Sequence, residues 1–272
     1  MPILNHLSSP DDWIDPDTVA RPVVTYGFVT DNLGKVEIDF HHHDRSQLLL
    51  TLRGVLACEL EGGLWIVPPQ SAMWIPGGVR HRISAAGSIE GYNAFIDPAS
   101  APDLPQASCT LSATPLLREL MVRCAHLPVH YAQDGMDGRL VGLLLDEIAI
   151  TPPGKLHLPM PSDRRLRGVV DMIMADPADR GTMADWAARA GLSERTLARL
   201  IGRETGMSFG RWRQQLKIML ALQLLARGST IQQVSDQLGY ESAGSFVTMF
   251  RKMLGAPPGR YMAAARTRAV PA

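Results

Sequence analysis

Four side chains in the first third of the chain have the types and spacing of a metal site. His41 and His43 stand two residues apart in the run F-H-H-H-D-R-S-Q, Gln47 ends that run, and His81 follows the turn P-G-G. Side chains two residues apart on a strand point to the same face, so we expect the first two imidazoles to converge. Three converging imidazoles suit Zn, Ni, Cu or Fe. The pattern predicts one bound divalent transition metal. The alternatives are histidines that line an effector pocket or that hydrogen-bond within their own domain.

A second group of side chains, near the C-terminus, has the chemistry of DNA recognition. Arg195 and Arg199 lie one helical turn apart, a spacing that suits bidentate contacts to guanine. Ser245 and Thr248 are expected to be weaker base readers, and Arg251 is expected to contact phosphate. The full set predicted to face DNA is Arg195, Thr196, Arg199, Arg203, Ser242, Ser245, Thr248, Arg251 and Lys252.

Two segments of similar layout, residues 182–206 and 230–251, must position this second group. Thr182 and Thr230 are placed to begin helices, and Gly191 and Gly239 to end them in the left-handed conformation. Two short helices joined by a glycine turn are typical of a helix-turn-helix, whose second helix enters the major groove. Residues 209–227 between the units form an amphipathic run, and a rigid helix there would hold the two reading helices about 34 Å apart. The side chains predicted on its buried side are Trp212, Leu216, Met219, Leu220 and Leu224.

These two segments resemble the DNA-binding domain of the AraC/XylS family of bacterial transcription regulators. The matching residues read A-x-x-x-G-L-S-x-R-x-L-x-R-x-x-x-x-x-x-G-x-S-F over 187–209 and I-x-x-V-x-x-x-L-G-Y-E-S-x-x-S-F-x-x-x-F-R-x-x-x-G-x-x-P-x-x-Y over 231–261. The resemblance covers about residues 163–265. It implies a double-stranded DNA operator as partner, RNA polymerase as a further partner if the protein activates, and dimers in many members. One departure is Gly244, which offers no side chain in the second reading helix.

The histidines fall in a region, residues 21–100, that is predicted to form a small β-barrel. Short β-rich runs follow one another at intervals of roughly 8 to 12 residues, with E-G-G, P-P-Q and P-G-G between them. The histidine run resembles the first cupin motif and residues 76–81 the second, with Gln47 in the place of the family's Glu and Ala85 in the place of its Asn. The resemblance implies a metal or effector site in the barrel mouth, with Trp65 and Trp74 as candidates for its apolar walls.

The remaining segments connect these parts. Residues 1–20 are predicted to be a loosely held N-terminal arm, residues 101–150 a helical pair, and residues 151–162, with four prolines, a linker to the DNA-binding domain at 163–265. The helical pair either covers the barrel or joins two subunits of a homodimer. Its two apolar stripes are Leu117, Leu120, Met121 and Cys124, and Leu140, Leu143, Leu144 and Ile148. The predicted fold class is α+β in two domains, a cupin-like β-barrel with a helical pair followed by an all-α double helix-turn-helix domain.

Charge is divided unequally between the two halves of the chain. Residues 1–160 hold 10 Lys and Arg against 18 Asp and Glu, a balance of −8, and residues 161–272 hold 17 against 9, a balance of +8. The C-terminal half therefore has the electrostatic footprint of a phosphate-binding domain. Three scattered cysteines favour reduced thiols in a cytoplasmic protein, and no export signal or membrane span is recognised.

We therefore expect a sequence-specific DNA-binding transcription regulator whose cupin-like domain senses a small molecule or metal ion and modulates promoter binding, without enzymatic activity. One alternative is a metal-dependent cupin enzyme tethered to a DNA-binding domain. Gln47 and the lack of a second acid–base constellation disfavour it. Another alternative is an accessory protein that binds DNA without an effector, whose operator affinity no ligand would change.

Overall fold

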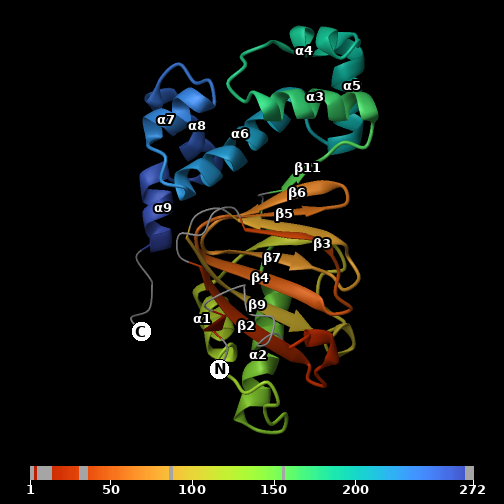
Figure 1. Ribbon diagram of the computed structural model, residues 1–272, viewed down its shortest axis with the longest axis vertical. Coiled ribbons are helices and arrows are strands. Elements are labelled where there is room, and N and C mark those ends of the chain that lie inside the picture. Colours follow the sequence, from red (N-terminus) through yellow and green to blue (C-terminus); the bar gives the residue numbers. More distant parts are fainter. Residues whose placement is uncertain (1–2, 5–13, 31–35, 86–87, 155–156, 267–272) are drawn as a thin grey trace. The chain divides into compact units, whose positions relative to one another are not determined.

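The computed structural model describes residues 3–4, 14–30, 36–85, 88–154 and 157–266 of the 272-residue chain. The chain divides into two compact units (Figure 1). The sheet domain consists mainly of residues 14–157, and the helical domain of residues 158–266 together with residues 62–64. Within the described ranges, no helix is both long and apolar enough to cross a membrane.

Two sheets, antiparallel except for one short edge pair, form the sheet domain. The six-stranded sheet has the order β1-β2-β9-β4-β7-β10, and the five-stranded sheet the order β11-β6-β5-β8-β3. Eight strands lie where the β-rich runs predict them: β2 (Val23–Thr30), β3 (Val36–His41), β4 (Ser46–Arg53), β5 (Leu56–Leu60), β6 (Gly63–Val67), β7 (Ser71–Ile75), β8 (His81–Ala85) and β9 (Ile89–Ile96). Three short strands were not predicted: β1 (Ile3–Leu4), which pairs parallel to β2, β10 (Cys109–Ser112) and β11 (His157–Pro159).

Side-chain alternation along the strands separates two hydrophobic cores. Leu49 on β4 packs with Met73, Ile75 and Ile83 between the sheets. The residues on either side of Leu49 face the helices on the outer surface of the six-stranded sheet. Trp74 belongs to this outer core, and its indole Nε1 donates to the carbonyl oxygen of Pro105 at 2.6 Å. The prediction that Trp74 walls the barrel mouth is therefore wrong.

Helices α1 (Pro115–Cys124) and α2 (Met136–Ile150) cover the outer surface of the six-stranded sheet. The stripe predicted on α1 is confirmed, because all four of its side chains are buried. The stripe predicted on α2 is partly wrong, since Leu143 is 46 % exposed and Leu140 is only half-buried. Val141 and Glu147 are buried instead, and the Glu147 carboxylate is satisfied there by the Thr114 hydroxyl, which donates to it.

The segment before β2 is packed against the sheet domain. Val19 is 3 % exposed and lies in a small core with Val24, Tyr26 and Phe95. The buried Arg45 guanidinium donates to the carbonyl oxygen of Val19 at 2.6 Å, which fixes this segment to the start of β4. The expectation of a loosely held arm is therefore wrong for residues 14–20. Residues 1–2 and 5–13 of that arm, and residues 155–156 of the predicted linker, lie outside the described residues.

Seven helices of the described chain build the helical domain. They are α3 (Arg164–Ala175), α4 (Met183–Arg189), α5 (Glu194–Thr205), α6 (Phe209–Ala226), α7 (Ile231–Gln237), α8 (Ala243–Leu254) and α9 (Pro258–Arg266). The pairs α4–α5 and α7–α8 are the two helix-turn-helix units, and α6 runs between them (Figure 1). The capping boxes at Thr182 and Thr230 are both present, and both turn glycines are left-handed. Helix α6 is buried on more sides than a single stripe predicts, since Ile218 and Leu222 are also buried, whereas Leu220 and Leu224 are only half-buried.

Candidate DNA-binding surface and histidine cluster

Helix α5 presents its arginines to solvent because its opposite face is fixed in the core. The Ser193 side chain caps the helix by accepting from the Thr196 amide at 3.2 Å. Leu197 and the two apolar residues that follow at helical spacing are buried. Arg195 and Arg199 are exposed, and within the described part of the chain neither forms an ion pair. Both guanidinium groups are therefore available to an external acceptor.

The other two predicted residues of α5 already have partners. The Thr196 hydroxyl lies 2.8 Å from the Ser193 hydroxyl. Arg203 is exposed and pairs with Glu204 at 3.2 Å, and the same carboxylate accepts from the backbone amide of Asp163 at 3.0 Å. These two side chains are therefore held by the helix and its neighbours, unlike Arg195 and Arg199.

Helix α8 uses the hydroxyls of its first turn for capping and presents its cations at its C-terminal end. Ser242 caps the helix, and the Ser245 hydroxyl donates to the Ser242 carbonyl oxygen at 2.8 Å. The hydroxyl predicted to read a base is therefore used to start the helix. Thr248, Arg251 and Lys252 are exposed as predicted. Phe246 and Phe250 on the opposite face are fully buried, which fixes the helix against the domain core.

Two cations on α6 tie the helix-turn-helix units together. The Arg213 guanidinium donates to the carbonyl oxygens of Asp179 and Gly181 at 2.7 and 2.8 Å, just before α4. The Lys217 ammonium, one turn later, donates to the carbonyl oxygen of Leu238 at 2.6 Å, at the end of α7. Burial lowers the pKa of Lys217 to about 8. The sequence analysis missed both residues, although two cations four apart on an otherwise buried helix are a readable signal.

The turn of the second unit packs directly on the loop that leads into the first unit. Gly239 has a φ of +68°, and a Cβ at this position would lie 2.2 Å from the carbonyl oxygen of Ala178. The turn of the first unit differs, because a Cβ on Gly191 (φ +66°) would meet nothing within 4 Å. Together with the α6 cations, this contact fixes the two units relative to one another inside the helical domain.

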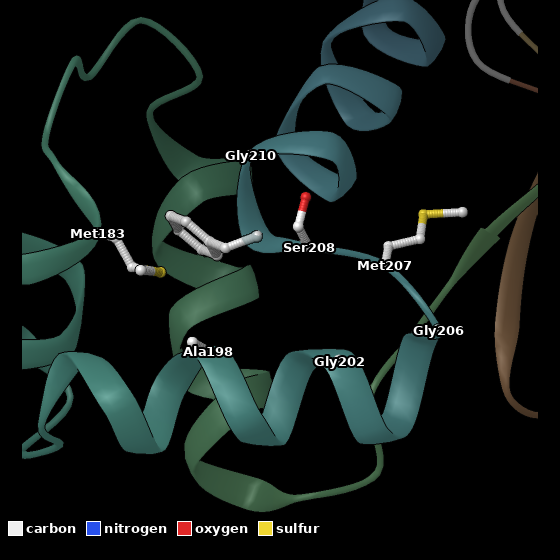
Figure 2. A pocket seen from close by; sticks show the side chains of 8 residues that line it. Met183, Ala198, Gly202, Gly206, Met207, Ser208 and Gly210 are labelled. Atoms are coloured by element: carbon white, nitrogen blue, oxygen red, sulfur yellow. The ribbon is translucent and has the colours of Figure 1, made fainter.

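A hollow of about 430 Å³ lies in the first unit, between α5 and the start of α6 (Figure 2). Its walls include Ala198 and Gly202 on α5, Gly206 and Ser208 in the turn that follows, and Gly210 at the start of α6. No titratable side chain lines it. The hollow therefore has no group for acid–base chemistry. None of the three clustered histidines is among its lining residues.

The three predicted histidines come together at one end of the sheet domain. His41 ends β3 and is the cross-strand partner of His81, which begins β8. His43 follows in the loop before β4, and one ring nitrogen from each histidine lies within 4.8 Å of the others. Gly77 in the P-G-G turn makes this possible, because a Cβ there would lie 2.3 Å from the carbonyl oxygen of Asp44. The His43 carbonyl accepts from the Gly78 amide at 2.7 Å and holds the loop against the turn.

Backbone carbonyls fix the protonation of two of these rings. His41 Nδ1 lies 2.7 Å from the carbonyl oxygen of Asp39, and His81 Nδ1 lies 2.9 Å from that of Val79. A carbonyl oxygen can only accept, so Nδ1 carries the proton on both rings and Nε2 keeps a lone pair. His81 Nε2 is buried and has no hydrogen-bond partner among the described residues. Burial lowers the pKa of His81 to about 4 and also lowers the pKa of His43.

Gln47 lies on the same inner face of β4 as Leu49. Its side-chain nitrogen donates to Asn93 Oδ1 at 2.9 Å, while its buried Oε1 has no partner within the described chain. His42, between the two clustered histidines of the first motif, is exposed and is not part of the cluster. The structure thus groups the three imidazoles and, among the described residues, leaves the Gln47 side-chain oxygen without a partner.

Comparison with known proteins adds two family matches. Residues 35–198 match the AraC-like ligand binding domain, and residues 186–264 match a helix-turn-helix domain. The HTH-type transcriptional regulator NimR of Escherichia coli is 45 % identical over 223 residues, which cover 82 % of this chain and 81 % of that protein. The HTH-type transcriptional regulator RipA of Corynebacterium glutamicum is 33 % identical over 103 residues, 38 % of this chain and 31 % of RipA. A solved structure of ToxT from Vibrio cholerae with a bound unsaturated fatty acid aligns over 88 % of this chain and 94 % of that chain, at 11 % identity and a TM-score of 0.38.

Proposed function

The chain belongs to the AraC family of helix-turn-helix transcription regulators, and from that premise we propose how it reads an operator and how it is controlled. Both helix-turn-helix units bind one face of double-stranded DNA, with α5 as the main reading helix and α8 as the weaker one. The observation that carries this assignment is the unpaired, exposed pair Arg195 and Arg199, set against the self-bonded Ser245 and the bare Gly244 of α8.

The contacts divide into positioning and reading. Arg195 and Arg199 read base edges in the major groove, where a guanidinium can donate two bonds to one guanine. Arg251 and Lys252 at the end of α8 bind phosphate, which orients the protein without reading sequence. The fixed joint made by Arg213, Lys217 and Gly239 holds both reading helices in register, so that they meet successive major grooves.

The sheet domain binds the effector at the histidine cluster, and the occupied cluster changes operator affinity. The protein has one state that binds the operator and one that does not, and an effector shifts the equilibrium between them only if it binds the two states with different affinity. The effector is a small molecule or a metal ion. The protein acts in the cytoplasm, where its DNA is, as a regulator and not as an enzyme.

Two further partners complete the proposal. RNA polymerase is a partner if the protein activates its promoter. A second copy of the chain binds along α2, where Met136, Leu143 and Ile150 recur every seven residues and are 67 %, 46 % and 76 % exposed. Residues seven apart lie close to one line along a helix, so these three side chains give the second copy one apolar row to cover.

One footprinting experiment tests the central claim. The purified full-length protein is footprinted on the DNA upstream of its own gene, with and without candidate effectors. We expect two protected major-groove segments about one helical turn apart, and protection that changes when an effector is added. Protection that no small molecule or metal alters would leave a DNA-binding protein without a sensor.

A further inference from the structure

We infer that His41, His43 and His81 form a binding site for one divalent first-row transition metal ion, of the Zn²⁺ or Ni²⁺ type. This inference rests on the proposed function and deepens it, because it names the class of ligand that the sheet domain senses. The evidence is the geometry of the rings and of the atoms that hold them.

Three neutral imidazole nitrogens converge on one point. One nitrogen from each ring lies within 4.8 Å of the others, and the ring centroids of His41 and His81 are 4.3 Å apart. An ion bonded to three imidazoles at about 2.0–2.1 Å would hold their nitrogens about 3.3 Å apart. Binding therefore requires the rings to move closer together, and His43 lies in the loop between β3 and β4.

Two of the three rings are already oriented as metal ligands. In metal sites the ring nitrogen that does not bind the ion usually donates to a carbonyl or carboxylate, which fixes the tautomer. His41 and His81 both make this bond through Nδ1, to the carbonyls of Asp39 and Val79. Their Nε2 lone pairs are left for a ligand that accepts electron pairs, which is what a metal ion is.

One buried ring nitrogen, His81 Nε2, is unsatisfied among the described residues. His81 is 1 % exposed, and its Nε2 has no hydrogen-bond partner in the described chain. Leaving such a group unpaired costs about 1–3 kcal/mol, so an otherwise well-bonded protein needs a reason for it. A bound ion supplies that reason, because it bonds to the lone pair.

A divalent cation also needs negative charge near its ligands. Three neutral imidazoles do not balance a divalent cation, and Gln47 adds no charge. The carboxylates of Asp15 and Asp17 lie close enough to act on His43, and Asp17 is held there by the backbone amides of Asp44 and Arg45, at 3.0 and 3.1 Å. These acids supply compensating negative charge from outside the ligand set. Three protein ligands also leave a coordination position open, as in sites where a further ligand exchanges.

The test is a titration of the full-length protein, first treated with a chelator, with Zn²⁺ by calorimetry and with Co²⁺ by visible absorption. We expect one ion per chain, and Co²⁺ bands that arise from nitrogen ligands. His43→Ala and His41→Ala should each weaken Zn²⁺ binding at least about 100-fold. His42→Ala is the matched control and should bind like the parent, because its ring is exposed and outside the cluster.

The outcomes separate the site from the proposed control of DNA binding. Failure to bind Zn²⁺, Ni²⁺ or Co²⁺, or equal affinity in the His42→Ala and His43→Ala variants, would overturn the metal site. In that case a response to a small organic effector that His43→Ala abolishes would leave the proposed function standing. One bound ion that requires His41 and His43 but leaves operator affinity unchanged would support the site and overturn its role as the effector. His81→Ala is avoided as the main variant, because its ring is part of the core.

Discussion

At the scale of single residues, the arginines differ in whether their guanidinium groups already bind other groups of the protein. Arg195 and Arg199 have no partner in the described structure, whereas Arg213 is bonded to two carbonyls and Arg203 pairs with Glu204. A guanidinium that already donates to the protein must give up those bonds before it can bind a base. Specificity should therefore concentrate in the two unpaired arginines.

This assignment predicts the effect of removing them. Arg195→Ala and Arg199→Ala should each weaken operator binding by about 1–3 kcal/mol and relax the preference at one base position. Arg251→Ala should weaken binding to all sequences alike and reduce the salt dependence, since it removes a phosphate contact. Arg123→Ala, an exposed arginine of the sheet domain, is the control and should change neither. Operator titrations against single-base variants measure these effects, and full discrimination in both α5 variants would contradict the choice of reading helix.

At the scale of elements, the joint between the two helix-turn-helix units makes a stability prediction. Gly191 and Gly239 hold the same place in their units and have nearly the same φ, so an alanine at either position costs about 1–2 kcal/mol for the left-handed backbone. Only at position 239 does the added Cβ meet a backbone oxygen, at 2.2 Å. Gly239→Ala should therefore lose a further amount of about 1–3 kcal/mol. Denaturant unfolding of the full chain, followed by helical circular dichroism, measures both, and equal losses would show that this contact does not bind the units together.

Helix α2 carries the prediction about assembly. Met136, Leu143 and Ile150 form an exposed apolar row that the described residues of one chain leave uncovered. Leu143→Asp should shift the protein from dimer to monomer in sedimentation equilibrium, because the pairing helices would bury a charge. Arg123→Ala on α1 is exposed and lies off α2, so it should leave the dimer unchanged. A parent protein that is monomeric at high concentration would contradict the proposed interface.

The elements also show how much the sequence alone can predict. Capping boxes, turn glycines and the α1 stripe were predicted correctly, because each depends on residues within one or two turns of one another. The convergence of His41, His43 and His81 was predicted from strand alternation and one turn. The errors are of another kind. Val19 is held by Arg45, Trp74 by Pro105 and Glu147 by Thr114, and each of these contacts joins parts of the chain that no local pattern connects.

At the scale of the whole molecule, the net charge of zero is the sum of an acidic half and a basic half. The half with a balance of +8 contains both helix-turn-helix units, and the half with −8 contains the histidine cluster. An acidic sheet domain attracts cations and is repelled by DNA phosphate, so the DNA is directed to the helical domain. The same charge distribution favours a cationic effector over an anionic one.

The last prediction follows from thermodynamic linkage between these two halves. If Zn²⁺ at the histidine cluster changes operator affinity by a given factor, operator DNA must change Zn²⁺ affinity by the same factor. We expect a coupling of about 1–3 kcal/mol, or about 5- to 150-fold in both affinities. Calorimetric Zn²⁺ titrations with and without saturating operator, beside operator titrations with and without Zn²⁺, measure the two factors independently. His41→Ala with His43→Ala should abolish the coupling and leave metal-free operator binding intact, since the residues proposed to read DNA lie on α5 and α8. A Zn²⁺ affinity that saturating operator leaves unchanged, beside an operator affinity that Zn²⁺ does change, would mean that the ion acts at some other place, such as the DNA or the helical domain.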